Sequence, residues 1–452
     1  MSIIYNPKQI NIIKKNIKKL EKNALREKQS ILEPTLDEMN NIRDIILKFI
    51  SDKKRIIYGG YASHLLLINK KQEGVYDLSI DTPDVEFYTP EPIKDLIDLC
   101  NVLYKHKLKY IQGKTAGHEE TYSIFVNFEN VCDLSYVPPN FYKKMDTITI
   151  NNNRIVHPKY EIINWLRQFT DPLTAGWRWE KQFIRMEKIQ KTYPFENIKG
   201  NIVNKISNEH KNAITDILDN FIKPRETIIL FNYFAYNKFM KMGGKKEIDI
   251  PYLDIVSVDY INDGKKLINF LKKKYKNDIE VIEYFPFFQY YKYNVKILYK
   301  KKTLINIYHH NNKCTPFKMS NDGFKIASFS FNLLMLLILQ EKTKNDNIDF
   351  INKNYKIMFN NLIDVRNDYL TKKKKTILDN TIFEDFFVNC LGTTMTQPRL
   401  YRLKIRKKIK QGKRATFNYE PSDKETYNLP DFKFSNSSGN KIINSKYLKF
   451  NI

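Results

Sequence analysis

Cysteine, acidic residues and long apolar runs are scarce in this chain of 452 residues. The four cysteines are scattered, with no CxxC or Cys/His spacing, which argues against a zinc site and a disulfide framework and favours a reducing compartment. The opening residues mix isoleucine with lysine and asparagine, so no signal peptide is indicated. The most apolar stretch, residues 326–340, is too short and too polar to span a bilayer. It predicts a buried core helix, and no membrane partner is expected.

The charge balance points to a polyanionic partner. The chain carries 76 Lys and Arg against 50 Asp and Glu, a formal net charge of +26. Nucleic acid is the commonest partner of so basic a surface. The abundance of Lys, Asn, Ile, Tyr and Phe is also what A/T-rich codons deliver, so part of the charge has a compositional explanation. With 42% hydrophobic residues the chain can bury real cores, and wholesale disorder is excluded.

Four segments follow from the pattern along the chain. Residues 1–50 have helical periodicity, and residues 51–190 alternate strands and helices around a small mixed sheet. Residues 191–395 repeat that alternation and end in a helical stretch. Residues 396–452 form a basic tail that is expected to be partly disordered. The predicted fold class is α+β, with helical flanks.

Three carboxylates suggest a cation site. In "DVEFY", Asp84 and Glu86 are two residues apart, so strand alternation places both on one face of the sheet. Asp133 stands in the middle of the later apolar strand "NVCDLSYV", where aspartate is unusual. Such a set suits two Mg²⁺ or Mn²⁺ ions, which can activate a hydroxyl and stabilise leaving pyrophosphate. Asp81 is an alternative ligand, although its odd spacing puts it on the other face.

Two adjacent glycines precede the acids. In "IIYGGYASHLLL" a short strand runs through Gly59 and Gly60 into a helix. Backbone N–H groups at such a junction can approach a phosphate, and Ser63 could add a hydroxyl donor. Each feature alone has an ordinary explanation as a tight turn or a solvated strand edge, but their order and spacing together are specific.

The order strand, Gly-Gly, helix, D-x-[DE] and later strand Asp resembles the polymerase-β-like nucleotidyltransferase superfamily. Within it, "YGGYASHLLL…PDVEFYT…CDLSYV" is similar to the poly(A) polymerase catalytic subunits of poxviruses, mimiviruses and other large DNA viruses. The resemblance is specific over residues 50–190. It implies a polymerase-β-like domain that extends an RNA 3′ end without a template, using ATP as substrate and releasing pyrophosphate. It also implies two Mg²⁺ or Mn²⁺ ions as cofactors, and a location in the host cytoplasm or in the virion.

The resemblance also assigns roles. Asp84 and Glu86 match the paired metal ligands, and Asp133 matches the third carboxylate, which by its chemistry would assist deprotonation of the primer 3′-hydroxyl. The glycines and Ser63 match the phosphate-binding signature. The second acid is Glu rather than Asp, which the motif tolerates.

A second copy is indicated at a constant offset of 173 residues. "IIYGGYASHLLL" lies over "ILFNYFAYNKFM". The same offset pairs Gly59 with Asn232, Gly60 with Tyr233, Asp84 with Ser257, Glu86 with Asp259, and Asp133 with Asn306. A unit without Gly-Gly and with one carboxylate is expected to be non-catalytic. Chance similarity between two Ile- and Tyr-rich segments is the alternative.

Basic residues are candidates for nucleotide and RNA contacts. Lys181, and next Arg178, follow the third carboxylate and would contact the triphosphate, while Trp177 and Trp179 are expected in the core. The densest positive segments contain Lys372, Lys373 and Lys374, and Arg406, Lys407 and Lys408, which suit sequence-independent phosphate contacts. Nearby Tyr369, Tyr401 and Phe417 could stack bases. His118 is a turn residue with a weaker claim on substrate.

Other functions share the same residues. A terminal uridylyltransferase, a CCA-adding enzyme or an oligoadenylate synthase would use the same triad, and a non-catalytic RNA-binding protein is a more distant alternative. The base pocket cannot be located in the sequence. A homodimer and a separate processivity partner both stay open.

Overall fold

The computed structural model describes residues 4–32, 34–204, 206–310, 313–393, 395–423, 429–430 and 433–450. The chain forms two compact units. Unit 1 comprises Met1–Val137, Asp146–Pro158 and Tyr401–Lys433, and unit 2 comprises Pro138–Met145, Lys159–Leu400 and Phe434–Ile452. The expected boundaries near residues 50, 190 and 395 do not coincide with these units and stay a prediction.

Unit 1 is built on an eight-stranded mixed sheet in the order β16-β3-β4-β5-β2-β1-β7-β6. Its strands are β1 (Ile56–Tyr58), β2 (Val85–Thr89), β3 (Gln112–Thr115), β4 (Thr121–Val126), β5 (Glu129–Tyr136), β6 (Thr147–Ile150), β7 (Asn153–Val156) and β16 (Asn418–Tyr419). Its helices are α1 (Pro7–Ile31), α2 (Leu36–Asp52), α3 (Gly59–Asn69), α4 (Pro92–Lys105) and most of α14 (Gln397–Lys410). The α+β expectation is confirmed.

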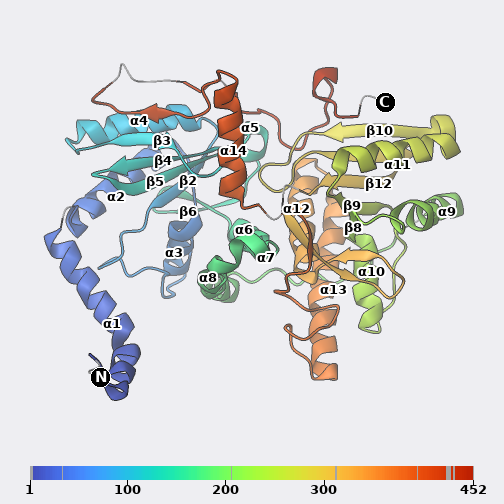
Figure 1. Cartoon of the computed structure of the whole chain (residues 1–452), viewed down its shortest axis with the longest axis horizontal. Coiled ribbons are helices and arrows are strands. Elements are labelled where there is room, and N and C mark those ends of the chain that lie inside the picture. The colour runs from blue at the N-terminus through green and yellow to red at the C-terminus, as the bar shows by residue number, and fades with distance from the viewer. Residues whose placement is uncertain are drawn as a thin grey trace. The chain divides into compact units, whose positions relative to one another are not determined.

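The N-terminal helices form as the periodicity predicts. The Thr35 hydroxyl accepts a hydrogen bond from the backbone N–H of Glu38, and the Glu38 carboxylate accepts one from the backbone N–H of Thr35, which is the expected capping box at the start of α2. The apolar face of α2, which includes Ile46 and Phe49, is buried. Helix α1 differs, because no residue of it, all of which the structure describes, is buried, and it runs away from the sheet of unit 1 (Figure 1).

Unit 2 contains a second eight-stranded sheet, in the order β10-β11-β12-β9-β8-β14-β13-β15. Its strands are β8 (Ile228–Phe231), β9 (Leu253–Ser257), β10 (Ile279–Tyr284), β11 (Asn294–Tyr299), β12 (Lys302–His309), β13 (Cys314–Met319), β14 (Lys325–Ala327) and β15 (Cys390–Gly392). Its helices are α5 (Pro139–Tyr142), α6 (Pro158–Phe169), α7 (Pro172–Ala175), α8 (Trp179–Thr192), α9 (Asn208–Asp216), α10 (Tyr233–Met242), α11 (Tyr260–Tyr275), α12 (Phe329–Asn345) and α13 (Asp349–Lys373).

The two sheets repeat one topology. Replacing β3-β4-β5-β2-β1-β7-β6 by β10-β11-β12-β9-β8-β14-β13 reproduces the strand order of the first sheet in the second. The directions agree as well: β1–β2 and β8–β9 are antiparallel, whereas β2–β5 and β9–β12 are parallel. A register shift falls after Ile124 in β4 and after Ile297 in β11, 173 positions apart. Such agreement in order, direction and irregularity is what a duplicated unit gives.

The C-terminal segment has more structure than its composition suggested. Strand β16 pairs with the edge strand β3, and Phe417 and Tyr419 are buried there. Farther on, the Glu283 carboxylate accepts hydrogen bonds from the backbone N–H groups of Lys449 and Phe450. The segment therefore adds to the core of each unit in turn.

Two expectations about unit 2 have different outcomes. The apolar stretch at 326–340 falls mainly in α12, whose residues are mostly buried, so the core helix is confirmed. Over the described residues, no helix is long and apolar enough to cross a membrane. The expected absence of disulfides is wrong: Cys314 and Cys390 are bonded, which ties β13 to β15. They are 76 positions apart, and strand pairing brings them together.

Candidate active site

The Gly-Gly turn is shaped around a carboxylate. Gly59 follows β1 with φ +80°, a conformation that side chains rarely adopt, and opens α3. A Cβ at Gly59 would lie 1.8 Å from Oε2 of Glu86. The same oxygen accepts a hydrogen bond of 3.1 Å from the backbone N–H of Gly60. In this structure, therefore, the space that the missing side chain leaves is filled by Glu86.

Two of the three predicted acids face each other across neighbouring strands. Glu86 on β2 is the register partner of Asp133 on the parallel strand β5. Asp84 immediately precedes β2. All three are partly exposed, whereas Val85 and Phe87 between and beyond them are buried, as the alternation predicts.

The charges of the three acids converge on one buried neighbour. The pKa of the Cys132 thiol is raised well above its ordinary value, first by burial and then by the carboxylates of Asp133, Asp84 and Glu86. The three acids are not arranged as a metal-binding group, since the described residues contain no group of three His, Cys, Asp or Glu in a metal-binding arrangement. Instead, Glu86 bonds to Gly60, and Asp133 accepts a 3.3 Å hydrogen bond from Asn130.

A row of polar side chains beside the acids was not predicted. The Tyr58 ring stacks on Tyr88 with centroids 3.9 Å apart, and its hydroxyl lies 2.8 Å from Oγ of Ser135. Ser135 in turn lies 2.9 Å from the hydroxyl of Thr121. Burial, followed by the Glu86 charge, raises the pKa of Tyr58. The signal was present in the sequence, because Ser135 is two positions after Asp133 and so shares its face of β5.

Ser63 has a structural partner. Its side chain is fully buried, and its hydroxyl donates a 3.1 Å hydrogen bond to the carbonyl of Gly59. This bond supports the first turn of α3, where the Gly-Gly backbone must hold its shape. Contact of Ser63 with a phosphate stays a prediction.

The predicted triphosphate contacts belong to unit 2. Arg178 ends a short 3-10 turn that runs directly into α8, and Lys181 is exposed in the first turn of α8. Trp179 was expected in the core, but it is only half-buried, and its ring packs against Phe386 with centroids 5.1 Å apart. Trp177 was expected in the core as well, but it is 77% exposed and stacks under the Arg178 guanidinium. The roles of Arg178 and Lys181 stay predictions.

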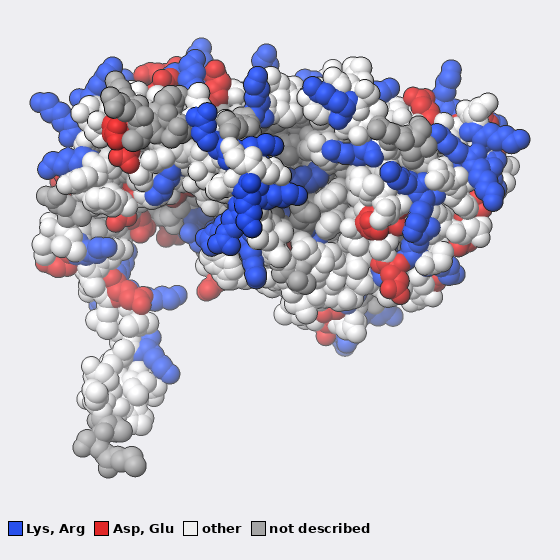
Figure 2. All heavy atoms as spheres, turned by 45° about the horizontal axis from the view of Figure 1, so that its top comes forward, with Lys and Arg blue, Asp and Glu red and all other residues white. Residues whose placement is uncertain are grey.

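The predicted RNA contacts are exposed at two places. Lys372 and Lys373 end α13, and Lys374 caps it in a left-handed conformation. The basic residues of the second segment, Arg406, Lys407 and Lys408, lie on α14. Figure 2 shows lysine and arginine side chains gathering on the face over α14. His118 is exposed in the loop between β3 and β4.

The prediction that Phe417 could stack on a base is wrong. Its ring is 2% exposed and contacts Tyr122 edge to face within unit 1. Tyr369 and Tyr401 are partly exposed, and the Tyr369 ring lies 5.0 Å from Phe383. Phe417 is buried because β16 extends the sheet, which its polar sequence context did not indicate.

In the second unit, a carboxylate hydrogen-bonded to two asparagine amides takes the place of the acids of the first unit. Asp254 on β9 is the register partner of Asn306 on β12, the arrangement that Glu86 and Asp133 have in unit 1. Asn232, at φ +55°, takes the place of Gly59. The amides of Asn232 and Asn306 donate to the Asp254 carboxylate at 2.6 and 2.8 Å. Both oxygens are therefore occupied, and burial raises the pKa of Asp254 to about 7.

This register corrects the gapless offset. Asp133 does correspond to Asn306, but Glu86 corresponds to Asp254 and not to Asp259, and Ser257 is not the counterpart of Asp84. The sequence offset between the two copies is 173 at Tyr58 and Phe231 but 168 at Glu86 and Asp254, the partners of these residues on the next strand. The chain between these two strands is therefore five residues shorter in the second copy.

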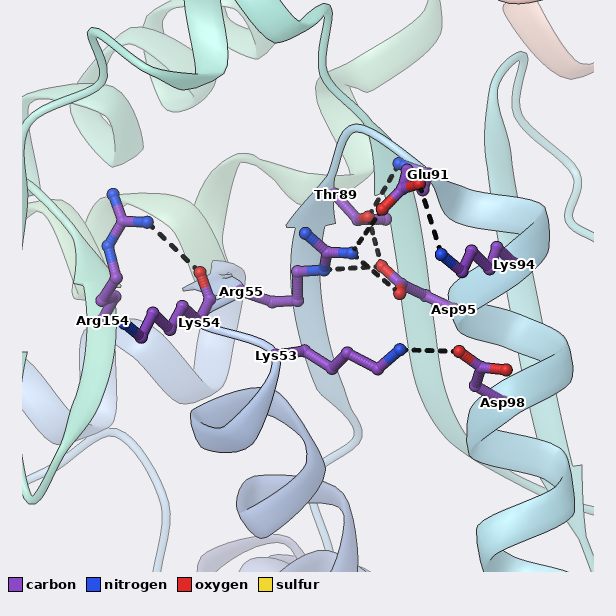
Figure 3. A network of polar contacts seen from close by, with 9 residues as sticks. All are labelled: Lys53, Lys54, Arg55, Thr89, Glu91, Lys94, Asp95, Asp98 and Arg154. Carbon is purple, nitrogen blue, oxygen red and sulfur yellow. Dashed lines mark hydrogen bonds and ion pairs between the residues drawn. The ribbon is translucent and has the colours of Figure 1, made fainter.

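The same polar network occurs separately in each unit, and it supports the correspondence of Glu86 with Asp254. The N–H of Glu91 donates to the Thr89 hydroxyl at 3.0 Å, and the N–H of Asp259 donates to Ser257 at the same distance. Thr89 bonds to the buried Asp95, as Ser257 bonds to Asp263. Figure 3 shows Asp95 held from the other side by Arg55, which links the start of β1 to α4. Ser257 and Asp259 therefore correspond to Thr89 and Glu91 of unit 1, which join the end of a strand to the start of the next helix.

Comparisons with known proteins agree with these features. A family model described as "Poly(A) polymerase catalytic subunit" matches residues 44–175. Another, described as "APMV, Putative poly(A) polymerase, catalytic subunit, C-terminal", matches residues 187–452. The "Putative poly(A) polymerase catalytic subunit" of Acanthamoeba polyphaga mimivirus is 35% identical over 99% of this chain and 85% of its own length. That of African swine fever virus (strain Badajoz 1971 Vero-adapted) is 30% identical over 35% of this chain and 34% of its own.

A solved structure matches both units. The crystal structure of the Megavirus polyadenylate synthase superposes with a TM-score of 0.91 at 33% identity, covering 99% of this chain and 95% of that one. The fold and the Gly-Gly turn beside strand carboxylates define a nucleotidyltransferase of the polymerase-β type. More narrowly, the chain belongs to the family of poly(A) polymerase catalytic subunits.

Proposed function

We propose that this enzyme adds AMP from ATP to RNA 3′ ends without a template and releases pyrophosphate. One observation carries the proposal: Glu86 and Asp133 are register partners on parallel strands, directly beside the Gly59–Gly60 turn. The second unit lacks this combination, because its single acid is bonded to two asparagine amides. Unit 1 is therefore the catalytic unit.

The donor set fits Mg²⁺ or Mn²⁺. Asp84, Glu86 and Asp133 offer carboxylate oxygens, which are the preferred ligands of these hard cations, and their shared influence on Cys132 supports their closeness. When bound, two such ions would neutralise charge on the attacking and leaving oxygens. Metal binding through Oε2 would require Glu86 to turn away from Gly60. That turn would leave the Gly60 N–H for a phosphate, so metal and triphosphate would be coupled through one side chain.

The residues of the chain would then have distinct tasks. Asp133 accepts the proton of the RNA 3′-hydroxyl, whose oxygen forms a bond to the α-phosphorus of ATP. The bond from that phosphorus to the bridging oxygen breaks, and pyrophosphate leaves. The Gly59–Gly60 backbone and Ser63 position the phosphates, and Lys181 and Arg178 neutralise the triphosphate. Positioning and charge neutralisation supply most of the rate.

RNA would be held mainly through its phosphates. The exposed Arg406, Lys407 and Lys408 on α14 and Lys372–Lys374 at the end of α13 supply cations that need no sequence. We place the activity in the host cytoplasm, with packaging in the virion as a further expectation of a viral polyadenylating enzyme. A homodimer and a separate partner subunit are both compatible with this proposal, and sedimentation of the active enzyme distinguishes a dimer from a single chain.

An extension assay tests the proposal. A short RNA primer is incubated with each of the four NTPs separately, with Mg²⁺ or with Mn²⁺. Extension with ATP, and little with the others, is expected. Extension with UTP or CTP in place of ATP would favour a uridylyl- or CCA-adding enzyme. No extension with any nucleotide would contradict the proposal and favour a non-catalytic RNA-binding protein.

A further inference from the structure

Two exposed aromatic rings stack on each other at the β4–β5 turn of unit 1. Phe128 lies in that turn, and Tyr110 lies in the loop that joins α4 to β3 (Figure 1). Their ring centroids are 4.8 Å apart. Phe128 is 76% exposed and Tyr110 is 63% exposed, so the pair buries little apolar surface and adds little to the stability of the fold. The position of the rings therefore needs another explanation.

The backbone under both rings has a conformation that glycine favours. Asn127 and Phe128 form a two-residue turn between the paired positions 126 and 129, with φ +50° and +68°. Hairpin turns with both φ values positive favour Asn-Gly, and a bulky side chain with positive φ is strained. Tyr110 also has φ +50°. Glycine would suit the fold better at residue 128, so a strained and exposed ring there points to a role in binding.

Three lysines accompany the rings. Lys105 ends α4, and Lys107 and Lys109 follow it in the loop before β3. All three are exposed, and within the described part of the chain no hydrogen bond or ion pair engages their ammonium groups. The carbonyl of Lys109 accepts a 3.1 Å hydrogen bond from the N–H of Asn127, which fixes the lysine loop to the β4–β5 turn. The cations are therefore held near the rings and are available to a ligand.

The charge of this surface favours an anionic partner. In the sequence, no acidic residue stands between Asp98 and Glu119, whereas that stretch holds four lysines. Glu129, exposed next to Phe128, opposes them with one negative charge. Exposed rings beside free cations are what single-stranded nucleic acid requires, since its bases stack on aromatic faces and its phosphates bind cations. Charge complementarity thus favours RNA over an apolar protein surface as the occupant.

We propose that Tyr110 and Phe128 stack on a base of the single-stranded RNA substrate, with the three lysines at its phosphates. This inference rests on the RNA extension proposed above. Asp133 is five positions beyond Phe128 and lies on β5, a span of about 17 Å along the strand. The stacked base would therefore lie a few nucleotides upstream of the 3′ end. The rings hold RNA of any sequence, because every base has a π face.

The first test compares Phe128→Gly with wild type in the full chain. RNA affinity is measured in EDTA from the fluorescence anisotropy of a labelled oligoadenylate of about twelve residues. Loss of one base stack should weaken binding about tenfold. The unfolding midpoint should equal or exceed that of wild type, because glycine suits the turn. Unchanged RNA affinity would overturn the proposal and leave the rings as a surface for a protein partner.

Phe350→Ala is the matched control, because Phe350 is a 67% exposed phenylalanine on α13 in the other unit. Its RNA affinity should equal that of wild type. An equal loss of affinity in Phe350→Ala and Phe128→Gly would overturn the proposal, since any exposed ring would then have the same effect.

Extension kinetics separate this inference from the proposed function. With ATP, Phe128→Gly should raise the KM for RNA about tenfold, which would account for its loss of extension at low RNA concentration. A wild-type KM in this variant would overturn the inference alone. Failure of wild type to extend RNA would overturn the polyadenylation, and the affinity comparison in EDTA would still decide whether the rings bind RNA.

Cross-linking locates the RNA on the wild-type chain. Primers carry 4-thiouridine at successive positions from the 3′ end, and the cross-linked peptides are identified by mass spectrometry. Cross-links to residue 110 or 128 are expected, and they should be strongest a few nucleotides upstream of the 3′ end. Cross-links found only at other residues would overturn the proposal.

Discussion

Glu86 and Gly60 are joined by a hydrogen bond of 3.1 Å from the backbone amide of the glycine to the carboxylate. The bond links the Gly59–Gly60 turn, which we propose binds phosphate, to β2, which carries the proposed metal ligand Glu86. It also explains why Gly59 carries no side chain, since a Cβ there would overlap the same carboxylate oxygen.

Gly59→Ala should therefore damage both activity and stability. The new methyl group must displace Glu86, and alanine must adopt φ +80°, a strain of about 1–3 kcal/mol. We expect a lower unfolding midpoint and a large loss of RNA extension. Gly117→Ala is the matched control, because φ there is ordinary and no described atom lies within 4 Å of its added Cβ. Equal behaviour of the two variants would contradict the account.

Asp254 should make stability depend on pH. Its pKa rises from 3.8 to about 7 on folding, so between these values the folded state binds the proton more tightly than the unfolded chain. Stability should therefore be lost as pH rises from about 4 to 7, by an amount of order 4 kcal/mol. Asp254→Asn should flatten that part of the curve. Urea unfolding of both proteins at several pH values measures the effect, and parallel curves would contradict it.

Reduction should destabilise unit 2. The Cys314–Cys390 bond closes a loop of 76 positions, for which chain entropy predicts roughly 4 kcal/mol of stabilisation. Wild type should unfold at lower temperature in dithiothreitol, and a Cys314→Ser, Cys390→Ser double variant should not respond to the reductant. The buried thiols Cys100 and Cys132 stay in both proteins as internal controls. A wild-type midpoint unaffected by reduction would exclude this role for the bond.

The α14 cations should account for part of the salt dependence of RNA binding. Changing Arg406, Lys407 and Lys408 to alanine removes up to three phosphate contacts, so the slope of log K against log salt should fall by about 2 for single strands. Lys265, Lys266 and Lys273, exposed on α11, give a control of equal charge change. An identical slope for the two triple variants would show that α14 does not lie on the RNA path.

Much of the site follows from short-range patterns, and the rest depends on pairing between distant strands. Alternation in "DVEFY" and "NVCDLSYV" is enough to put Glu86 and Asp133 on one face, because the apolar residues directly before and after each acid point to the buried face of the sheet. A constant offset could not reveal the five residues missing from the second copy, since only the Asp254–Asn306 register does. Likewise, Phe417 looks like part of a polar tail until β16 pairs with β3.

The most direct test of the central claim compares matched acids in the two units. Glu86→Gln and Asp254→Asn each replace a strand carboxylate by its amide at corresponding register positions. RNA extension with ATP is measured beside RNA affinity and the unfolding midpoint. We predict that Glu86→Gln lowers the rate about a thousandfold or more while RNA binding is kept, because several kcal/mol of metal-based stabilisation is lost. Asp254→Asn should extend RNA at a rate close to wild type. Full activity in Glu86→Gln, or its loss in folded Asp254→Asn, would contradict the account.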